Sequence, residues 1–465
     1  MRITFLGHQG WRFENGGRSV LLDPILEEIG NGRTTLPVWP QRRLDFRELE
    51  PLDAVIVSHE HADHFSLDTL AALPTRCRIY ISDLSSVAMA TAIAELGFEV
   101  TRFAALHSFS ICGLKLTALP GLYNTLEPDT YGLLVQDAAG ASFLTGIDTV
   151  PHPDVLGWLA RRCPVRTLDN LTNNFVEPRQ PLVEESGAGT KSRSIVAGNL
   201  LEFVQKFEPR RAVLSGQGWC FKGAKAKLNH SFFSVDNHWL AAAARELAPQ
   251  VQWFEGVPGM RFTLAVDGFA VDRAPEIGVL ETPSRAFDPT SVREPEPFSS
   301  WSGTRNVPAD RLRKVRDFIV GELGRILGAH APNLMQRLYY LKFRDNGKVA
   351  PTFGITVRNA NARYAFELDY GHLTFTEVDA AAKPAAVGVE IWASDFELLL
   401  AAEEDAFTVV ESAVRTWSHA RELIDAPMLL ETFLWFTPRF RPDEFLRFYR
   451  SRIAELRARR ELRHA

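Results

Sequence analysis

The sequence has few cysteines and no long apolar run. Its 465 residues include four cysteines, Cys77, Cys112, Cys163 and Cys220, and none of them forms a CxxC pair. A disulfide framework or a thiolate zinc site is therefore not expected, and we predict reduced, mostly buried thiols. No stretch reaches the roughly 18 to 20 apolar residues that a membrane span needs. The first residues are too short an apolar run for a secretory signal, so we expect a cytoplasmic protein without a transmembrane segment.

The sequence also lacks a large excess of charge of either sign. Its 52 basic and 57 acidic side chains leave a net charge of −5. This balance argues against nucleic acid or an acidic membrane surface as a partner, because both call for a basic surface. The hydrophobic fraction of 46% is close to that of an ordinary globular protein. The length suggests two or three domains of about 150 residues each.

Strand-like and helical segments alternate in the first part of the chain and predict an α/β domain over residues 1–272. Residues 54–57 are apolar throughout, as expected of a strand that is buried on both faces. A helix is predicted to follow at about residues 66–73. The prolines then become frequent without any sustained periodicity, so we interpret residues 273–309 as a proline-rich linker.

The last part of the chain predicts an additional α+β domain over residues 310–465. A helix over about residues 310–327 precedes two or three strands, and a second helical region begins with Ser394-Asp395 as its cap. The last twenty residues predict a basic helix. We interpret its arginines as a solvated face, because glutamates are mixed among them.

Residues 58–64 concentrate the side chains that can carry chemistry. They read Ser-His-Glu-His-Ala-Asp-His and hold three of the 12 histidines of the chain, directly after the buried strand. His59 and His61 are two apart in an extended segment, so both imidazoles project to one side and can reach one metal. Asp63 and His64 point to an adjacent position that suits a second ion. A polar loop with coincidental histidines is the alternative, but it offers no reason for such clustering.

This HxHxDH pattern after a hydrophobic strand resembles the signature motif of the metallo-β-lactamase superfamily. Residues 6–10 (Leu-Gly-His-Gln-Gly) and 22–24 (Leu-Asp-Pro) are similar to the branch of ascorbate-6-phosphate lactonases and N-acyl-phosphatidylethanolamine phospholipase D. The resemblance covers about residues 1–270 and implies an α/β fold, a four-layer αββα sandwich. It also implies an aspartate that bridges two metals after a strand, and Asp148 in the segment Gly-Ile-Asp-Thr matches that position.

Two histidines that the superfamily supplies from later loops are missing. Residues 120–129, where the third ligand of the first metal is expected, contain no histidine. Residues 212–219, where the last ligand of the second metal is expected, contain none either. The alternatives for the first position are Tyr123, Asn124, Glu127, Asp129 or no ligand at all. Lone histidines at other spacings are His152, His230 and His238. Fewer imidazoles and more oxygen donors shift the preference from Zn²⁺ towards Fe or Mn.

A second and closer resemblance is to CMP-N-acetylneuraminate hydroxylase outside its Rieske domain. It rests on residues 57–70, 208–211, 216–221 and 229–231. The C-terminal portion is similar to the end of that enzyme and, more weakly, to a sterol-carrier-like lipid-binding module. The hydroxylase begins with a Rieske iron–sulfur domain, and this chain has no such cysteine–histidine pairs. The resemblance therefore implies an oxygen-activating diiron enzyme that takes its electrons from a separate reductase.

Two polar loops indicate an anionic small-molecule substrate. Residues 187–194 combine glycines and hydroxyls with Lys191 and Arg193, and three further lysines stand between residues 222 and 227. Cations beside a metal suit a phosphate or a carboxylate, although two solvated loops would give the same composition. We predict substrate contacts from His8, Tyr123, Asn124, Lys191, Arg193 and His230.

Three hypotheses follow. The first is a metal-dependent hydrolase with two divalent ions, Zn or Fe, with Mn as a further option. Its ions are held by His59, His61, Asp63, His64 and Asp148. A metal-bound hydroxide attacks an ester, lactone, amide or phosphodiester of an anionic small molecule, and catalytic roles fall to Asp63, as acceptor of the water's proton, and to His64. The second is the diiron oxygenase with its separate reductase. The third is a non-catalytic binding protein with an incomplete metal site.

Overall fold

The structure of the chain is a computed structural model. It describes residues 1–32, 35–121, 129–149, 153–162, 167–170, 204–205, 207–221, 226, 229, 237–265, 268–281, 300–330, 353–369, 371–381, 385, 387–404, 409, 414–418 and 442–464. Within these ranges, no helix combines the length and the apolar character that crossing a membrane requires. Cys77, Cys112 and Cys220 are buried, and Cys77 and Cys112 are free thiols, as predicted. Cys163 lies outside the described residues.

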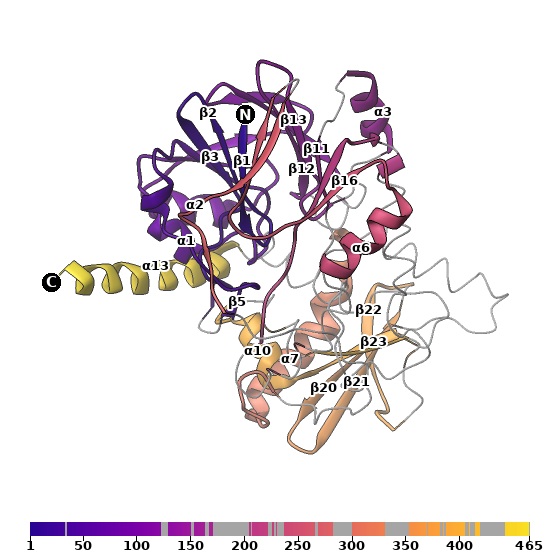
Figure 1. The fold of residues 1–465 in the computed structure, drawn as a ribbon. Helices are drawn as coiled ribbons and strands as arrows, with labels where there is room; N and C mark the ends of the chain where they lie inside the picture. The colour runs from indigo at the N-terminus through magenta and orange to yellow at the C-terminus, as the bar shows by residue number, and fades with distance from the viewer. Residues whose placement is uncertain are drawn as a thin grey trace.

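An eight-stranded mixed sheet forms one half of the first domain (Figure 1). The strands of residues 2–7, 10–15 and 18–22 form an antiparallel ribbon. The strand of residues 54–57, which leads into the histidine motif, pairs in parallel with the last strand of this ribbon. The two glycines Gly16 and Gly17, with φ of 59° and 75°, form the tight turn of this ribbon. In order, the strands are β18 (Phe269–Arg273), β17 (Met260–Leu264), β1 (Arg2–Gly7), β2 (Gly10–Asn15), β3 (Arg18–Leu22), β7 (Ala54–Val57), β8 (Arg78–Ser82) and β9 (Glu99–Phe103).

A seven-stranded sheet forms the other half. Its first four strands are antiparallel and the rest are parallel. In order, they are β10 (Ser108–Ile111), β11 (Leu114–Pro120), β12 (Tyr131–Gln136), β13 (Ser142–Thr145), β14 (Thr167–Asn170), β15 (Arg211–Leu214) and β16 (Gln252–Glu255).

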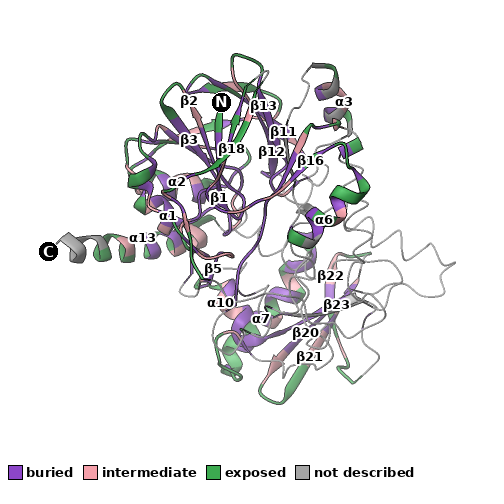
Figure 2. Cartoon of the chain, viewed as in Figure 1, coloured by how far each residue is buried: buried purple, intermediate pink, exposed green. Residues whose placement is uncertain are grey.

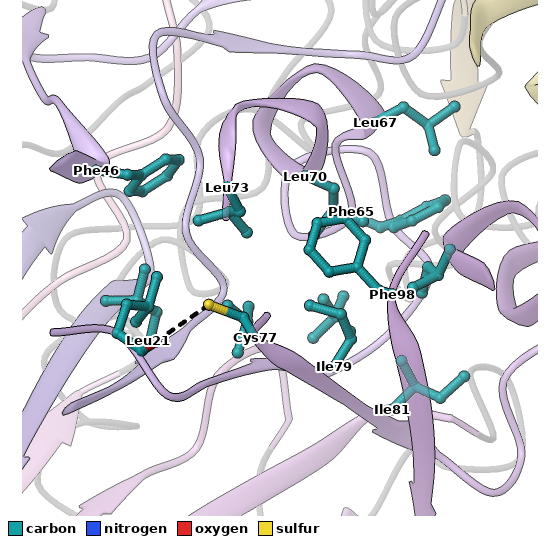
Figure 3. Packing of buried hydrophobic residues seen from close by; sticks show 14 of the residues in the cluster. Leu21, Phe46, Phe65, Leu67, Leu70, Leu73, Cys77, Ile79, Ile81 and Phe98 are labelled. Atoms are coloured by element: carbon teal, nitrogen blue, oxygen red, sulfur yellow. Dashed lines mark hydrogen bonds between the residues drawn. The ribbon is translucent and has the colours of Figure 1, made fainter. Parts of the chain in front are cut away.

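The two sheets pack face to face over a shared apolar core (Figure 2). Trp11 of the first sheet meets Phe143 of the second, with ring centroids 4.9 Å apart. The helices α1 (Leu67–Ala72) and α2 (Val87–Glu95) cover the outer face of the first sheet (Figure 3). The helices α3 (Pro153–Arg162) and α6 (Asn237–Leu247) cover the second. The αββα layering implied by the resemblance is therefore confirmed.

A separate five-stranded sheet with its own apolar core follows in the chain. Its strands, in order, are β22 (Thr374–Val378), β21 (Ala362–Asp369), β20 (Phe353–Asn359), β23 (Val387–Trp392) and β24 (Arg415–Ser418). The helix predicted over 310–327 is present as α7 (Ala309–Phe318), which continues through a π turn, Ile319–Leu323, into α8 (Gly324–His330). Helix α10 (Ala393–Leu400) packs on the same sheet.

The prediction that Ser394-Asp395 caps this last helix is wrong. Helix α10 begins at Ala393 without a side-chain cap. The carboxylate of Asp395 instead accepts hydrogen bonds from Ser300 Oγ at 2.8 Å and from the backbone N–H groups of Trp301 and Ser302. Burial raises the pKa of Asp395 despite these donors. The residue therefore fixes a distant segment of chain, which its local sequence could not indicate.

The C-terminal helix α13 (Pro442–His464) returns to the first domain and lies against α1 and α2 (Figure 1). The prediction of a helix at the end of the chain is confirmed, but the prediction that its arginines form a solvated face holds only in part. Tyr449 and Ile453 are only 4% and 2% exposed and belong to the core cluster of the first sheet. Its arginines divide between water and protein, because Arg447 is exposed whereas Arg452 pairs with Asp68 of α1 at 2.8 Å.

Candidate metal centre

Three chain segments meet at one end of the sandwich to form the site. The first is the loop of residues 58–64 after β7, which we call the histidine loop. The second is the turn between β1 and β2, and the third is the loop of residues 146–149 after β13. These segments lie far apart in sequence, and the pairing of β3 with β7 and the packing of the two sheets bring them together.

The ring nitrogens of His59 and His64 converge on one carboxylate oxygen. The Nε2 atoms of His59 and His64 lie 3.4 Å and 2.8 Å from Oδ2 of Asp148. The ring of His61 stands edge-on to that of His59, with 4.2 Å between the centroids. His59, His64 and Asp148 are therefore within reach of a common cation, and His61 stands beside them.

Three overlapping groups of side chains offer ligand atoms within 4.8 Å of one another. They are His59, His64 and Asp148; His61, Asp63 and Asp148; and His8, Asp63 and His64. Asp148 is shared by the first two groups, which is the arrangement a bridging carboxylate requires. We expected His59 and His61 to share one ion, and these groups place His64 beside His59 as well. The chain turns after His61, whose carbonyl accepts from the N–H groups of His64 and Phe65, and this turn brings His64 beside His59.

Asp23 and Ser58 orient two of the imidazoles through hydrogen bonds at Nδ1. The Asp23 carboxylate accepts from the Ser58 N–H and hydroxyl, both at 2.7 Å, and lies 2.9 Å from Nδ1 of His64. The hydroxyl of Ser58 donates to Asp23, so it accepts from Nδ1 of His59 at 2.8 Å. Both rings therefore keep a proton on Nδ1, and Nε2 is the nitrogen that each directs at the site, as in a metal-bound histidine.

His8 orients Asp63 in a similar way. Its Nδ1 accepts from the N–H of Gly218 at 3.2 Å, so its proton is on Nε2, which lies 3.1 Å from Oδ2 of Asp63. His8 is 3% exposed, with φ in the left-handed region at 55°. The structure places His8 against Asp63, and the contact with substrate that we expected of it stays a prediction.

The site concentrates negative charge around His64. Burial opposes a charge on this ring, but the carboxylates of Asp148, Asp63 and Asp23 outweigh burial and raise its pKa well above the usual value. Burial also opposes charge on the two site carboxylates. The nearby His64 nevertheless lowers the pKa of both Asp63 and Asp148 well below their usual range. A cluster of buried carboxylates needs a cation, and a metal can replace the proton on His64.

Some of the buried polar atoms that lack a hydrogen bond are atoms that a metal would use. Apart from the approach of the two ring nitrogens to Asp148, the buried atoms His59 Nε2, His64 Nε2 and Asp63 Oδ1 have no hydrogen-bond partner among the described residues. Burial and the neighbouring His59 lower the pKa of His61 well below its usual value, so this ring stays neutral, as a ligand must be. A donor set of imidazole nitrogens and carboxylate oxygens suits Zn, Fe or Mn. The residues present therefore fit a metal.

Of the other residues considered for the site, the structure describes Asp129 and His238. Asp129 is buried, but its Oδ2 accepts from the N–H of Glu60 at 3.1 Å, so it supports the histidine loop rather than joining a ligand group. His238 is exposed on α6 beside Glu255 and belongs to none of the ligand groups. Outside the described residues lie Tyr123, Asn124, Glu127, His152, Lys191, Arg193, the lysines of 222–227 and His230.

Three residues that sequence reasoning missed support the site. Asp23 and Ser58 orient the imidazoles, and Gln9 ties neighbouring loops together by accepting from Ser215 Oγ at 3.0 Å and donating to the carbonyl of Ile147. The signal for Asp23 was its place at the end of β3, next to the strand that leads into the histidine loop.

Comparison with known proteins agrees with this picture for part of the chain. Residues 18–216, which include the histidine loop and Asp148, match the family described as Beta-lactamase superfamily domain. This part of the chain is therefore similar to the metallo-β-lactamase superfamily.

Two curated relatives carry the description "UPF0173 metal-dependent hydrolase". The one from Aeropyrum pernix is 29% identical over 156 residues, which are 32% of this chain and 60% of the relative. The one from Rubrobacter xylanophilus is 35% identical over 66 residues, which are 14% of this chain and 23% of the relative. The chain thus spans at most about 60% of the length of either relative.

Solved structures with a similar arrangement include two enzymes of different chemistry. An isothiocyanate hydrolase from Delia radicum gut bacteria has 15% identity and a TM-score of 0.40, over 57% of this chain and all of that chain. CmlA, a diiron β-hydroxylase from Streptomyces venezuelae, has 18% identity and a TM-score of 0.39, over 57% of this chain and 54% of that chain.

Proposed function

We propose that this protein is a metal-dependent hydrolase that binds two divalent ions, Zn or Fe, with Mn as a further option. The observation that carries the proposal is the convergence of His59, His61, Asp63 and His64 on Asp148, with the Nε2 atoms of His59 and His64 directed at its carboxylate. The description of the partial relatives as metal-dependent hydrolases supports the same reaction class.

A bound divalent metal would supply Lewis-acid chemistry and make water reactive near neutral pH. Asp148 offers the oxygen common to two ligand groups, so it would hold both ions at a fixed separation. Asp23 keeps the proton of His64 on Nδ1 and so keeps Nε2 available. We assign proton acceptance from the attacking water to Asp63, because its Oδ1 has no hydrogen bond whereas its Oδ2 is engaged by His8.

We further propose that the substrate is an anionic small molecule that carries an ester, lactone, amide or phosphodiester bond. The support is the cationic composition of residues 187–194 and 222–227, which follow the metal motifs in sequence. Lys191 and Arg193 are the proposed partners of a phosphate or carboxylate group.

Metal content and hydrolysis, measured on the same preparations, test the proposal. Protein purified without added metal is assayed for bound metal and for turnover of a phosphodiester, an ester and a lactone. His61→Ala should lose metal and turnover, whereas the control His238→Ala, at an exposed position, should keep both. The proposal would be contradicted if His61→Ala kept both its metal and its turnover. It would also be contradicted if the wild type bound no metal after incubation with Zn²⁺, Fe²⁺ or Mn²⁺. Two irons with oxygen consumption on reduction, and no hydrolysis, would favour the oxygenase instead.

A further inference from the structure

Glu60, between the first two histidines of the motif, is held by residues from distant parts of the chain. Its Oε1 accepts from Ser86 Oγ at 2.7 Å and from the hydroxyl of Tyr449 at 3.1 Å. Its Oε2 accepts from the N–H of Ser86 at 3.2 Å, and its own N–H donates to Asp129. Ser86 is the N-cap of α2, where the helix dipole favours a carboxylate. Glu60 therefore anchors the histidine loop to the body of the domain.

Tyr449 is the most distant of these anchors in sequence, 389 positions after Glu60. It lies on α13, and its ring also packs edge-on against Phe65, with 5.5 Å between the centroids. Phe65 directly follows His64 and is fully buried. A single tyrosine thus contacts the histidine loop in its middle, at Glu60, and just beyond its end, at Phe65.

The helix that carries Tyr449 is firmly docked. Arg452 of α13 makes hydrogen bonds to both carboxylate oxygens of Asp68, at 2.8 and 2.9 Å. Ile453, one turn after Tyr449, is buried in the same apolar cluster. These contacts fix the height and rotation of the helix, so the tyrosine hydroxyl is presented to Glu60 with little freedom.

We propose that Tyr449 is a positioning residue for the metal centre, and that the C-terminal helix is a working part of that centre. The tyrosine hydroxyl fixes the carboxylate of Glu60, and this fixes the backbone that carries His59 and His61. A hydrogen bond to a charged carboxylate is among the stronger ones in proteins. Partners outside the first ring of ligands typically change metal affinity by about 10- to 100-fold when they are removed. The inference rests on the metal site of the proposed function but not on its substrate or reaction.

The test compares Tyr449→Phe with Arg450→Gln. The first substitution removes the hydroxyl and keeps the ring on Phe65. The second removes the exposed ion pair that Arg450, at the next position of the same helix, forms with Glu95 at 2.6 Å. Two properties are measured: backbone hydrogen exchange of residues 58–65 in the metal-free protein, and the dissociation constant of Co²⁺ followed through its visible absorption. We expect Tyr449→Phe to accelerate exchange in this segment and to weaken Co²⁺ binding about tenfold, with an altered visible spectrum. Arg450→Gln should change none of these.

A Glu60→Ala background separates positioning from general packing. In that background Tyr449→Phe should have no further effect on exchange or on Co²⁺ affinity, because the hydroxyl has lost its partner. Unchanged exchange in the single Tyr449→Phe variant would overturn the inference, as would an equal effect with and without Glu60. The exchange measurement needs no metal, so it decides the role of Tyr449 even if the wild type binds no Co²⁺, a result that would count against the proposed function instead.

Discussion

Replacing Asp23 by asparagine should weaken metal binding without removing any ligand. The Asp23 carboxylate uses one oxygen for the N–H of Ser58, and the other for the hydroxyl of Ser58 and Nδ1 of His64. Asparagine has a single oxygen, so its NH₂ group must face one of these two sides. If it faces His64, the ring proton moves to Nε2 and the metal-binding nitrogen is lost. If it faces the Ser58 N–H, two donors oppose each other in a buried site.

The expected losses of metal affinity and of stability follow from these two orientations of the asparagine. Loss of a partner that orients a metal-bound histidine typically costs 10- to 100-fold in affinity, which is about 1.4 to 2.8 kcal/mol. The opposed donors would add a cost of about 1 to 3 kcal/mol to the stability of the metal-free protein. We therefore expect Asp23→Asn to bind Zn²⁺ or Co²⁺ at least tenfold more weakly than the wild type.

Competition with a chromophoric chelator gives the affinity, and nitrogen-15 NMR of the imidazoles gives the tautomer. Asp45→Asn is the matched control, because Asp45 pairs with Arg47 at the surface, outside the ligand groups. An Asp23→Asn protein with wild-type affinity and its His64 proton still on Nδ1 would refute the reasoning.

Three further predictions concern stability and reactivity. Gly7→Ala should lower the free energy of unfolding by about 1 to 3 kcal/mol in urea titrations, because Gly7 has φ of 101° and an added Cβ would lie 2.8 Å from Arg42 Nε; an unchanged midpoint would contradict this. Arg452→Ala should cost about 1 to 2 kcal/mol, since a half-buried Asp68 loses both hydrogen bonds, and limited proteolysis should then release the C-terminal helix faster than in the wild type. Burial raises the pKa of Cys77 to about 11. The free energy of unfolding should therefore fall as the pH rises from about 9 to 11, because in this range the thiol ionises only in the unfolded chain. A Cys77→Ala variant with the same decline would exclude this cause.

The sequence was most informative where function depends on a contiguous segment. Residues 58–64 place six polar side chains directly after an apolar strand, and this pattern indicates a cation site and resembles the motif of a superfamily. The α/β layers follow from the alternation of apolar strands and helices, since each must bury one face against the next.

The sequence was least informative where contacts join distant segments. Asp23 acts on His64 across 41 positions and Tyr449 acts on Glu60 across 389 positions, so neither pairing leaves a local pattern. The same reason explains the error at Asp395. An aspartate at the start of a helix reads as a cap, but tertiary packing turned its carboxylate towards residues 300–302 instead.

An anomalous-difference map most directly tests the central claim that the histidine loop and Asp148 bind a cation. Crystals grown from protein supplied with Zn²⁺, Fe²⁺ or Mn²⁺ should show two peaks, about 3.5 to 4 Å apart, each about 2.0 to 2.2 Å from imidazole nitrogens or carboxylate oxygens of this cluster. Density at the two positions should disappear in His61→Ala or be strongly reduced there. Ordered His59, His64 and Asp148 side chains with no anomalous peak between them, for any of the three metals, would contradict the account.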